Sequence, residues 1–310
     1  MLLFWIVFNA YILFLLLVDL LVINKPGRII TFKQTLLSCA VWIGLALIFA
    51  VAIHFIMGGT KSLEFLTGYL VEEALSIDNL FVFILLFAYF KVPPEQERTV
   101  LFWGILGAMI MRAFFIVAGI ALVKRFHWIL YLFGAFLVYS GLQLLRGKEN
   151  EVDPSRSFVL RFAKKLFPVT DTYEGGKFFV IREGKRFATP LLIVLLIVET
   201  TDILFATDSI PAILAITRDS FIVYTSNVFA ILGLRSLYFA ISGLMKLFHH
   251  LHYGLALVLV FIGAKMLIQA RYEFHTATTL IVIVSILGLS ILASILFPPK
   301  AKEEPKQDVV

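Results

Sequence analysis

Two acidic stretches of the sequence contain side chains that could bind a metal ion. VEEALSIDNL covers residues 71–80, and VETTDILFATDSIP covers residues 198–211. Each stretch lies inside a long apolar run, where an ionised carboxylate costs roughly 2.5–3.5 kcal/mol on membrane-insertion scales. A sequence that keeps several such groups must give them partners or a function, so these acids are the candidate functional residues.

Hard oxygen donors surround the acids. The acids of the two stretches are Glu72, Glu73, Asp78, Glu199, Asp202 and Asp208. The polar neighbours that we expect to line a pathway include Asn79, Thr207 and Ser209. No His or Cys lies beside them, and oxygen-only sites favour magnesium, calcium or manganese over zinc or copper. The pattern predicts a buried site for a hard divalent cation.

Basic residues within the apolar runs allow a second interpretation. These residues are Arg112, Arg235 and Lys265. If all the groups are charged, the acids outnumber the bases, and the deficit suits a divalent cation, protons or both. The alternative is that the acids only pair with these bases to fix the helices. We expect that simpler role for Glu73.

Composition places the chain in a membrane. Of its 310 residues 60% are hydrophobic, well above the roughly 45–50% of soluble domains. Several apolar runs exceed about 18 residues. The sequence therefore predicts an all-α polytopic membrane protein, and its net charge of +6 says little about nucleic acid. The expected fold has about nine transmembrane helices, near residues 2–23, 36–57, 63–90, 98–123, 128–145, 188–216, 220–245, 253–270 and 277–297.

The Lys and Arg residues predict the orientation. With the N-terminus outside, most of the loop Lys and Arg residues fall on the cytoplasmic side, as the positive-inside rule requires. The loop 146–187 is then cytoplasmic, with an amphipathic helix expected at 155–167 and a hairpin at 177–190. The polar tail 298–310 is expected to be cytoplasmic and disordered.

An internal repeat relates the two acidic stretches. When VEEALSIDNLFVFILL (71–86) is aligned with TTDILFATDSIPAILA (201–216), Glu72 falls on Asp202 and Asp78 on Asp208. Further along, Gly141 falls on Gly263. Each unit has three helices, so the second copy must be inverted, an architecture typical of transporters with a site at the repeat interface. The expected domains are two N-terminal helices (1–57), a first repeat (63–145), the loop (146–187), a second repeat (188–270), a last helix (277–297) and the tail (298–310).

Pro211 predicts a local irregularity. Inside a helix, proline removes one backbone hydrogen bond and clashes with the carbonyl four residues earlier. We expect residues 207–211 to kink and to unwind beside Asp208.

Three segments together resemble the TerC/Alx family of membrane proteins. They are LTGYLVEEALSIDNLFVF, TDTYEGGKFFV, and VETTDILFATDSIPAILAIT followed by SNVFAILGLRSLYF. The resemblance extends from about residue 19 to the end of the eighth expected span. It implies a LysE-type transporter in the bacterial cytoplasmic membrane, a link to tellurium resistance, and manganese export. It also implies the metal ligands Glu72, Asp78, Glu199, Asp202 and Asp208.

Export of a divalent cation requires a coupled energy source. Moving the ion out against about 100 mV, inside negative, costs about 4.6 kcal/mol. We therefore expect proton coupling, with manganese as the transported ion and no permanently bound cofactor. The expected partners are the metal ion, protons and the lipid bilayer, and not nucleic acid; the oligomeric state is left open.

Other functions remain open. They are transport of calcium or another divalent cation, a channel mechanism, and a membrane component of a metal- or tellurite-stress complex that transports nothing itself. An intramembrane aspartic protease is disfavoured because no Gly-x-Gly-Asp motif surrounds Asp202 or Asp208. No enzymatic activity is expected.

Overall fold

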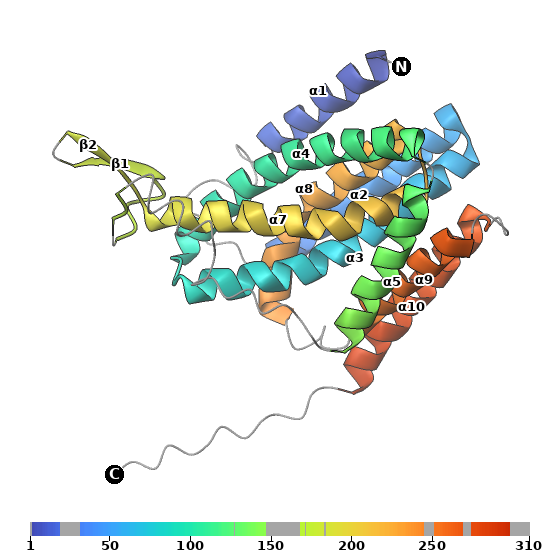
Figure 1. Ribbon diagram of the computed structural model, residues 1–310. Coiled ribbons are helices and arrows are strands. Elements are labelled where there is room, and N and C mark those ends of the chain that lie inside the picture. The colour runs from blue at the N-terminus through green and yellow to red at the C-terminus, as the bar shows by residue number, and fades with distance from the viewer. Residues whose placement is uncertain are drawn as a thin grey trace, which may run out of the picture.

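Long apolar helices make up almost all of the part of the chain that the structure describes (Figure 1). The computed structural model describes residues 2–18, 32–126, 128–146, 168–170, 172–182, 184–244, 251–268 and 274–297. The amphipathic helix expected at 155–167 and the tail lie outside these residues. The described helices are α1 (Leu2–Val18), α2 (Phe32–Met57), α3 (Gly59–Tyr89), α4 (Pro94–Arg125), α5 (Ile129–Leu145), α7 (Pro190–Leu214), α8 (Ser220–Leu244), α9 (Leu251–Ile268) and α10 (Thr276–Leu296).

Local sequence signals fix several helix ends. Pro94 and Pro190 each occupy the first position of a helix, where the missing N–H costs nothing. Asp219 caps α8, because its carboxylate accepts hydrogen bonds from the backbone N–H groups of Phe221 (3.0 Å) and Ile222 (3.4 Å). Gly58 separates α2 from α3 with a φ of 93°, a conformation that glycine adopts without strain.

The helices are those of an all-α membrane protein. Six of those that the structure describes are long and apolar enough to cross a membrane: α2, α4, α7, α8, α9 and α10. The helix α3 has 31 residues, ample length for a span, but its acids and Lys61 interrupt the apolar character. The helix α4 begins at Pro94, earlier than the span expected from residue 98, because the polar segment PEQER is already helical.

The helix α8 lies at the centre of the bundle. In the most apolar 18-residue segment of α8, 83% of the residues are buried inside the protein. The corresponding share is 22% for α2 and 28% each for α4 and α10. The outer helices expose large apolar side chains, including Phe55 on α2 and Phe114 on α4. Those side chains face the position that lipid takes around a membrane protein.

The first helices of the two expected repeats run antiparallel. A Cβ at Gly68, near the start of α3, would collide with Ile213, near the end of α7. At the same end, Thr217, just after α7, donates a hydrogen bond of 2.5 Å to Glu64 of α3. An inverted second unit requires this direction.

Glycines allow α5 and α9 to pack backbone against backbone. A Cβ at Gly263 would lie 2.6 Å from the carbonyl oxygen of Gly134, and a Cβ at Gly141 would lie 2.7 Å from that of Ala256. Small residues at such contacts are typical of membrane helix pairs. In Figure 1, α5, α9 and α10 form a group of their own beside the longer helices.

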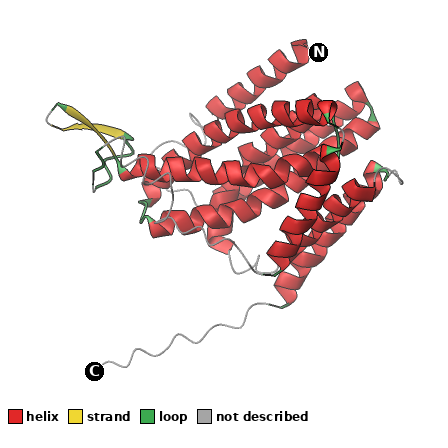
Figure 2. Ribbon diagram, in the orientation of Figure 1, coloured by secondary structure: helices red, strands yellow, loops and turns green. Residues whose placement is uncertain are grey.

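A two-stranded hairpin projects beyond the helices (Figure 2). The strands β1 (Phe179–Arg182) and β2 (Lys185–Ala188) are antiparallel, and Phe179 pairs with Ala188. They flank Gly184, which has a φ of 75°, and they lie within the hairpin expected at residues 177–190. Tyr173 ties the neighbouring loop to the helices by donating a hydrogen bond of 2.8 Å to the carbonyl of Phe90.

The local unwinding expected at Pro211 is absent. The helix α7 is continuous from Pro190 to Leu214 with Pro211 inside it. Buried neighbours from α3, α4 and α9 share one core cluster with this segment, and the segment stays helical despite the lost hydrogen bond. The helix α3 is also continuous past Glu72 and Asp78, so the two positions stay about 120° apart around its axis.

Candidate functional site

Arg112 of α4 connects acids from both acidic stretches. Its Nη1 forms an ion pair with Glu72 of α3, and its Nη2 lies 3.5 Å from Oδ1 of Asp202 on α7. Nη1 also donates hydrogen bonds to Asn227 of α8 (3.0 Å) and Ser209 of α7 (3.3 Å). Four helices therefore contribute to one polar centre, which we call the Arg112 centre: Glu72, Arg112, Asp202, Ser209 and Asn227.

The Arg112 centre is closed to solvent. Glu72 is 1% exposed, Arg112 2% and Asp202 5%. Glu72, Arg112 and Asp202 also lie well inside α3, α4 and α7, away from the helix ends. Charges in such surroundings interact strongly, because neither water nor salt screens them. With both carboxylates ionised and Arg112 protonated, the centre keeps one negative charge.

The hydrogen bonding of this centre is incomplete. Among the described atoms, Nε and Nη2 of Arg112 and Oδ2 of Asp202 are buried without a hydrogen-bond partner. A buried ion pair stabilises a fold only when its remaining polar atoms are satisfied. The centre is thus poorly arranged as a purely structural link, although its oxygen atoms suit a hard cation.

Two further predicted site residues lie near this centre in the chain but have other neighbours. Glu199 of α7 lies against Gly107 of α4, where a Cβ would collide with the carboxylate. Asp208 of α7 accepts a hydrogen bond of 2.9 Å from Ser140 of α5. The side chain of Asp78 lies outside the described part of the structure. Among the described side chains, no group of three or more His, Cys, Asp or Glu residues is arranged to hold a metal ion.

The neighbouring polar residues differ in burial. Asn79 and Ser209 are buried, at 6% and 2% exposed. Thr207 is exposed and bonds back to the carbonyl of Leu204 at 2.5 Å. Thr207 therefore lies outside the enclosed part of the predicted pathway in this conformation.

The pairing expected for Glu73 is wrong. Its carboxylate lies against Gly233 of α8, beside Trp42, and Oε2 is buried with no hydrogen-bond partner among the described residues. The reason is geometric, since neighbouring residues on a helix point about 100° apart and Glu73 faces α2 and α8 while Glu72 faces Arg112. Of the other predicted charge partners, Lys265 donates to the backbone carbonyl of Ala215 at 3.3 Å, and Arg235 is buried on α8.

Three residues that contact the acids or Arg112 were not singled out by the sequence. Asn227 and Ser140 have ordinary polar side chains in apolar helices, and Gly107 has none. A polar residue within an expected span is itself a signal, because it is costly there without a partner. That signal would have selected Asn227.

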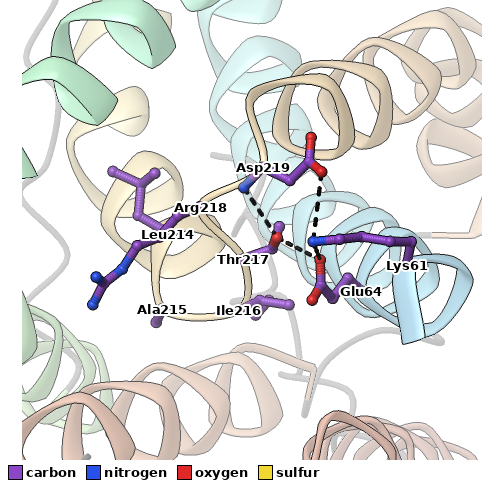
Figure 3. A pocket seen from close by; sticks show the side chains of 8 residues that line it. All are labelled: Lys61, Glu64, Leu214, Ala215, Ile216, Thr217, Arg218 and Asp219. Atoms are coloured by element: carbon purple, nitrogen blue, oxygen red, sulfur yellow. Dashed lines mark hydrogen bonds and ion pairs between the residues drawn. The ribbon is translucent and has the colours of Figure 1, made fainter. Parts of the chain in front are cut away.

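A second polar cluster lies where the start of α3 meets the end of α7 (Figure 3). It borders a pocket of about 560 Å³ formed by Lys61, Glu64 and residues 214–219. The amine of Lys61 lies 2.7 Å from Glu64 and 3.5 Å from Asp219. Partial burial acts to lower the pKa of Lys61, but the hydrogen bond and charge of Glu64, together with Asp219, outweigh it and raise that pKa.

The chain matches the family model described as "Integral membrane protein TerC family" over residues 57–302. It is 43% identical to the membrane protein STKORF319 of Myxococcus xanthus, covering 98% of this chain and 94% of that protein. It is also 43% identical to a Salmonella typhi protein named "Putative membrane-bound redox modulator Alx", covering 94% and 93%. A Rickettsia bellii membrane protein is 40% identical, covering 94% and 97%. No solved structure matches the chain significantly. With its helical membrane fold and this match over most of its length, the chain belongs to the TerC family of integral membrane proteins.

Proposed function

We propose that this protein is a transporter that exports a hard divalent cation, with manganese as the expected ion, in exchange for protons. The observation that carries the proposal is the meeting of Glu72 and Asp202, from two antiparallel helices, at one buried centre with the oxygens of Ser209 and Asn227. Carboxylate, amide and hydroxyl oxygens are the ligands that manganese, magnesium and calcium prefer. Glu199 and Asp208 would extend the pathway along α7, and we place Asp78 of α3 in the same pathway.

The helix contacts support two inverted repeats of three helices. In the alignment that places Gly141 on Gly263, Gly134 falls on Ala256. The contact of Gly134 with Gly263 is then the image of the contact of Gly141 with Ala256. A two-fold relation produces such reciprocal pairs. The site would lie at the interface of the repeats, where alternating access can expose it to either side.

The nine-span arrangement follows if α1, α3 and α5 also cross the membrane. In this topology the hairpin and the loop 146–187 lie on the cytoplasmic side, and the Lys61 pocket opens to the outside. Tyr173 supports the assignment, because it joins the loop to the α3–α4 turn on the same side. The membrane would be the bacterial cytoplasmic membrane.

Proton coupling follows from energetics. Outward movement of a divalent cation against about 100 mV costs about 4.6 kcal/mol, whereas exchange for two protons moves no net charge. Carboxylates that bind a metal ion must release their protons, so both ions compete for the same groups.

A second candidate function is a partner in a stress-response complex. The hairpin exposes Ile181 (71% exposed) and Phe179 (46%), which are apolar side chains suited to a protein contact. The name of the Salmonella relative refers to a redox role. This chain has one cysteine, Cys39, so it cannot form an internal disulfide, and a redox role here would need another chemistry.

The test is ion flux into liposomes that contain the purified protein and a divalent-sensitive dye. Manganese, calcium, magnesium and zinc are added in turn, with and without a pH gradient. We expect manganese flux that responds to the gradient and is lost in Glu72→Gln, Asp78→Asn and Asp208→Asn, with Glu95→Gln on the exposed first turn of α4 as the control. No flux of any ion from folded protein would refute the transport function and favour the stress-complex partner.

A further inference from the structure

The guanidinium of Arg112 occupies the position among the oxygens of the centre where a cation would bind. Its Nη1 contacts Glu72, Ser209 and Asn227, and its Nη2 is close to Asp202. These are the oxygen atoms that the proposed function assigns to the transported ion. A metal ion and the guanidinium cannot both hold the same oxygens, because they would overlap and repel each other.

The charges also indicate a replacement. Glu72 and Asp202 together with Arg112 leave one negative charge in a space that water does not reach. A divalent cation in place of the guanidinium would cancel both carboxylate charges. A monovalent cation would leave the same net charge as Arg112 and gain nothing by displacing it. The arginine would therefore favour divalent over monovalent ions.

The contacts of Arg112 leave part of its hydrogen-bonding capacity unused. Strong Arg–carboxylate pairs use two parallel N–H···O bonds. Here Nε and Nη2 have no hydrogen-bond partner among the described atoms, and Oδ2 of Asp202 also has none. A cation that satisfied Asp202 fully would compensate for the loss of the arginine contacts.

We propose that Arg112 is a tethered counter-cation: it offsets one of the two carboxylate charges when no metal ion is bound and must withdraw when one binds. The inference rests on the proposed function, since it assigns a role within the same site. It makes Arg112 a positioning and selectivity residue that competes with the substrate. Without it, a site that has released its metal ion and has not yet bound protons would hold two uncompensated buried carboxylates, at a high cost.

The experiment compares binding and flux in three variants of the full-length protein. Manganese binding is measured by calorimetry in detergent, and manganese flux is measured in liposomes. Arg112→Gln removes the competing charge and keeps a polar group of similar shape. Arg112→Lys keeps the charge without the planar group. Arg125→Gln removes the same charge from the exposed end of the same helix and is the control.

The counter-cation predicts opposite changes in binding and flux. Arg112→Gln should bind manganese at least about tenfold more tightly, because no tethered charge competes, yet transport it more slowly, because no tethered charge helps to displace the bound ion. Sodium should also compete with manganese in this variant more than in the wild type. Arg112→Lys should keep measurable flux with an affinity within about threefold of wild type, and Arg125→Gln should match the wild type in both.

Other outcomes overturn the inference. Unchanged or weaker manganese binding by folded Arg112→Gln, beside a wild-type protein that transports manganese, would reduce Arg112 to a structural residue and leave the proposed function intact. If Arg112→Gln does not fold, Arg112→Lys decides: loss of flux with normal folding would show that the planar pairing geometry matters and not the charge. A wild-type protein that neither binds nor moves manganese would refute both.

Discussion

Glu199 lies against Gly107, so that a carboxylate of α7 occupies the space where a side chain of α4 would otherwise stand. Glu73 of α3 has the corresponding neighbour in Gly233 of α8. The two glycines are separated by the same number of residues as the two glutamates. By these contacts Glu73 is the counterpart of Glu199 in the other three-helix unit, although the two residues do not touch. The acidic motifs of the sequence instead align Glu73 with Ile203.

The contact between Glu199 and Gly107 predicts the effect of a methyl group. Gly107→Ala should displace the Glu199 carboxylate, the flexible end of its side chain, and should cost less than the about 1–3 kcal/mol of an overpacked core. It should also reduce manganese flux if Glu199 belongs to the pathway. Thermal unfolding in detergent and liposome flux measure the two effects. Gly44→Ala is the control, because no atom lies within 4 Å of the added Cβ; equal behaviour of the two variants would contradict the prediction.

Asn227 should contribute to the stability of the Arg112 centre. Asn227→Leu removes the acceptor 3.0 Å from Nη1 of Arg112, and hydrogen bonds to charged groups contribute about 1.5–3 kcal/mol. We expect a loss of that size in the free energy of unfolding, measured by denaturant titration in mixed micelles. Ser226→Ala is the comparison, because the hydrogen bond that Ser226 makes among the described residues stays within its own helix, to the carbonyl of Val223. A larger loss for Ser226→Ala would argue against the importance of the Asn227 contact.

The glycine contacts of α5 and α9 should tolerate no side chain. In Gly134→Val, the added Cβ would lie 2.9 Å from the carbonyl oxygen of Gly263, so the helices must separate. We expect destabilisation of about 1–3 kcal/mol or more, seen as a lower unfolding temperature. The same change at Gly288 of α10, where a Cβ meets open space, should have little effect. If both variants unfold at the wild-type temperature, the close packing of these helices is not what stabilises them.

The Lys61 pair should have a defined pH dependence. Its raised pKa means that the pair contributes fully below the ordinary lysine pKa, and that the contribution is lost as the pH rises through the higher folded-state value. Lys61→Met should cost about 0.5–1 kcal/mol at neutral pH, as partly exposed ion pairs do. The difference from wild type should vanish only in strong alkali. Unfolding measured from pH 7 to 11 tests this, with the exposed Lys33→Met as the control.

The sequence predicted the helices and their class because its apolar runs and turn residues are strong local signals. Its repeated acidic motif also singled out Glu72 and Asp202, which both contact Arg112 in the structure; their role as metal ligands stays a prediction. The sequence could not predict that Arg112 would lie between them. The position of Arg112 depends on the rotation of α4 relative to α3 and α7, and packing across the whole bundle sets that rotation.

Two errors have physical causes of the same kind. The expected unwinding at Pro211 considered only the local effect of proline, but α7 remains helical there, where buried neighbours pack against it. The expected pairing of Glu73 considered the number of charges but not the direction in which each side chain points. The helix turns the Glu73 carboxylate towards Gly233. Asp78 and the segment 155–167 were predicted from the sequence and remain predictions.

The burial of α8 has a consequence for how the protein is made. This helix has the lowest mean hydropathy of the six candidate spans, and it carries Thr225, Ser226 and Asn227 with almost no exposure. Such a segment partitions weakly into lipid by itself. The helices that enclose it, α2, α3 and α4, all precede it in the chain. These helices are synthesised first. The helix α8 can therefore leave the translocon directly into a groove between them, where polar groups such as Arg112 can bind its polar side chains.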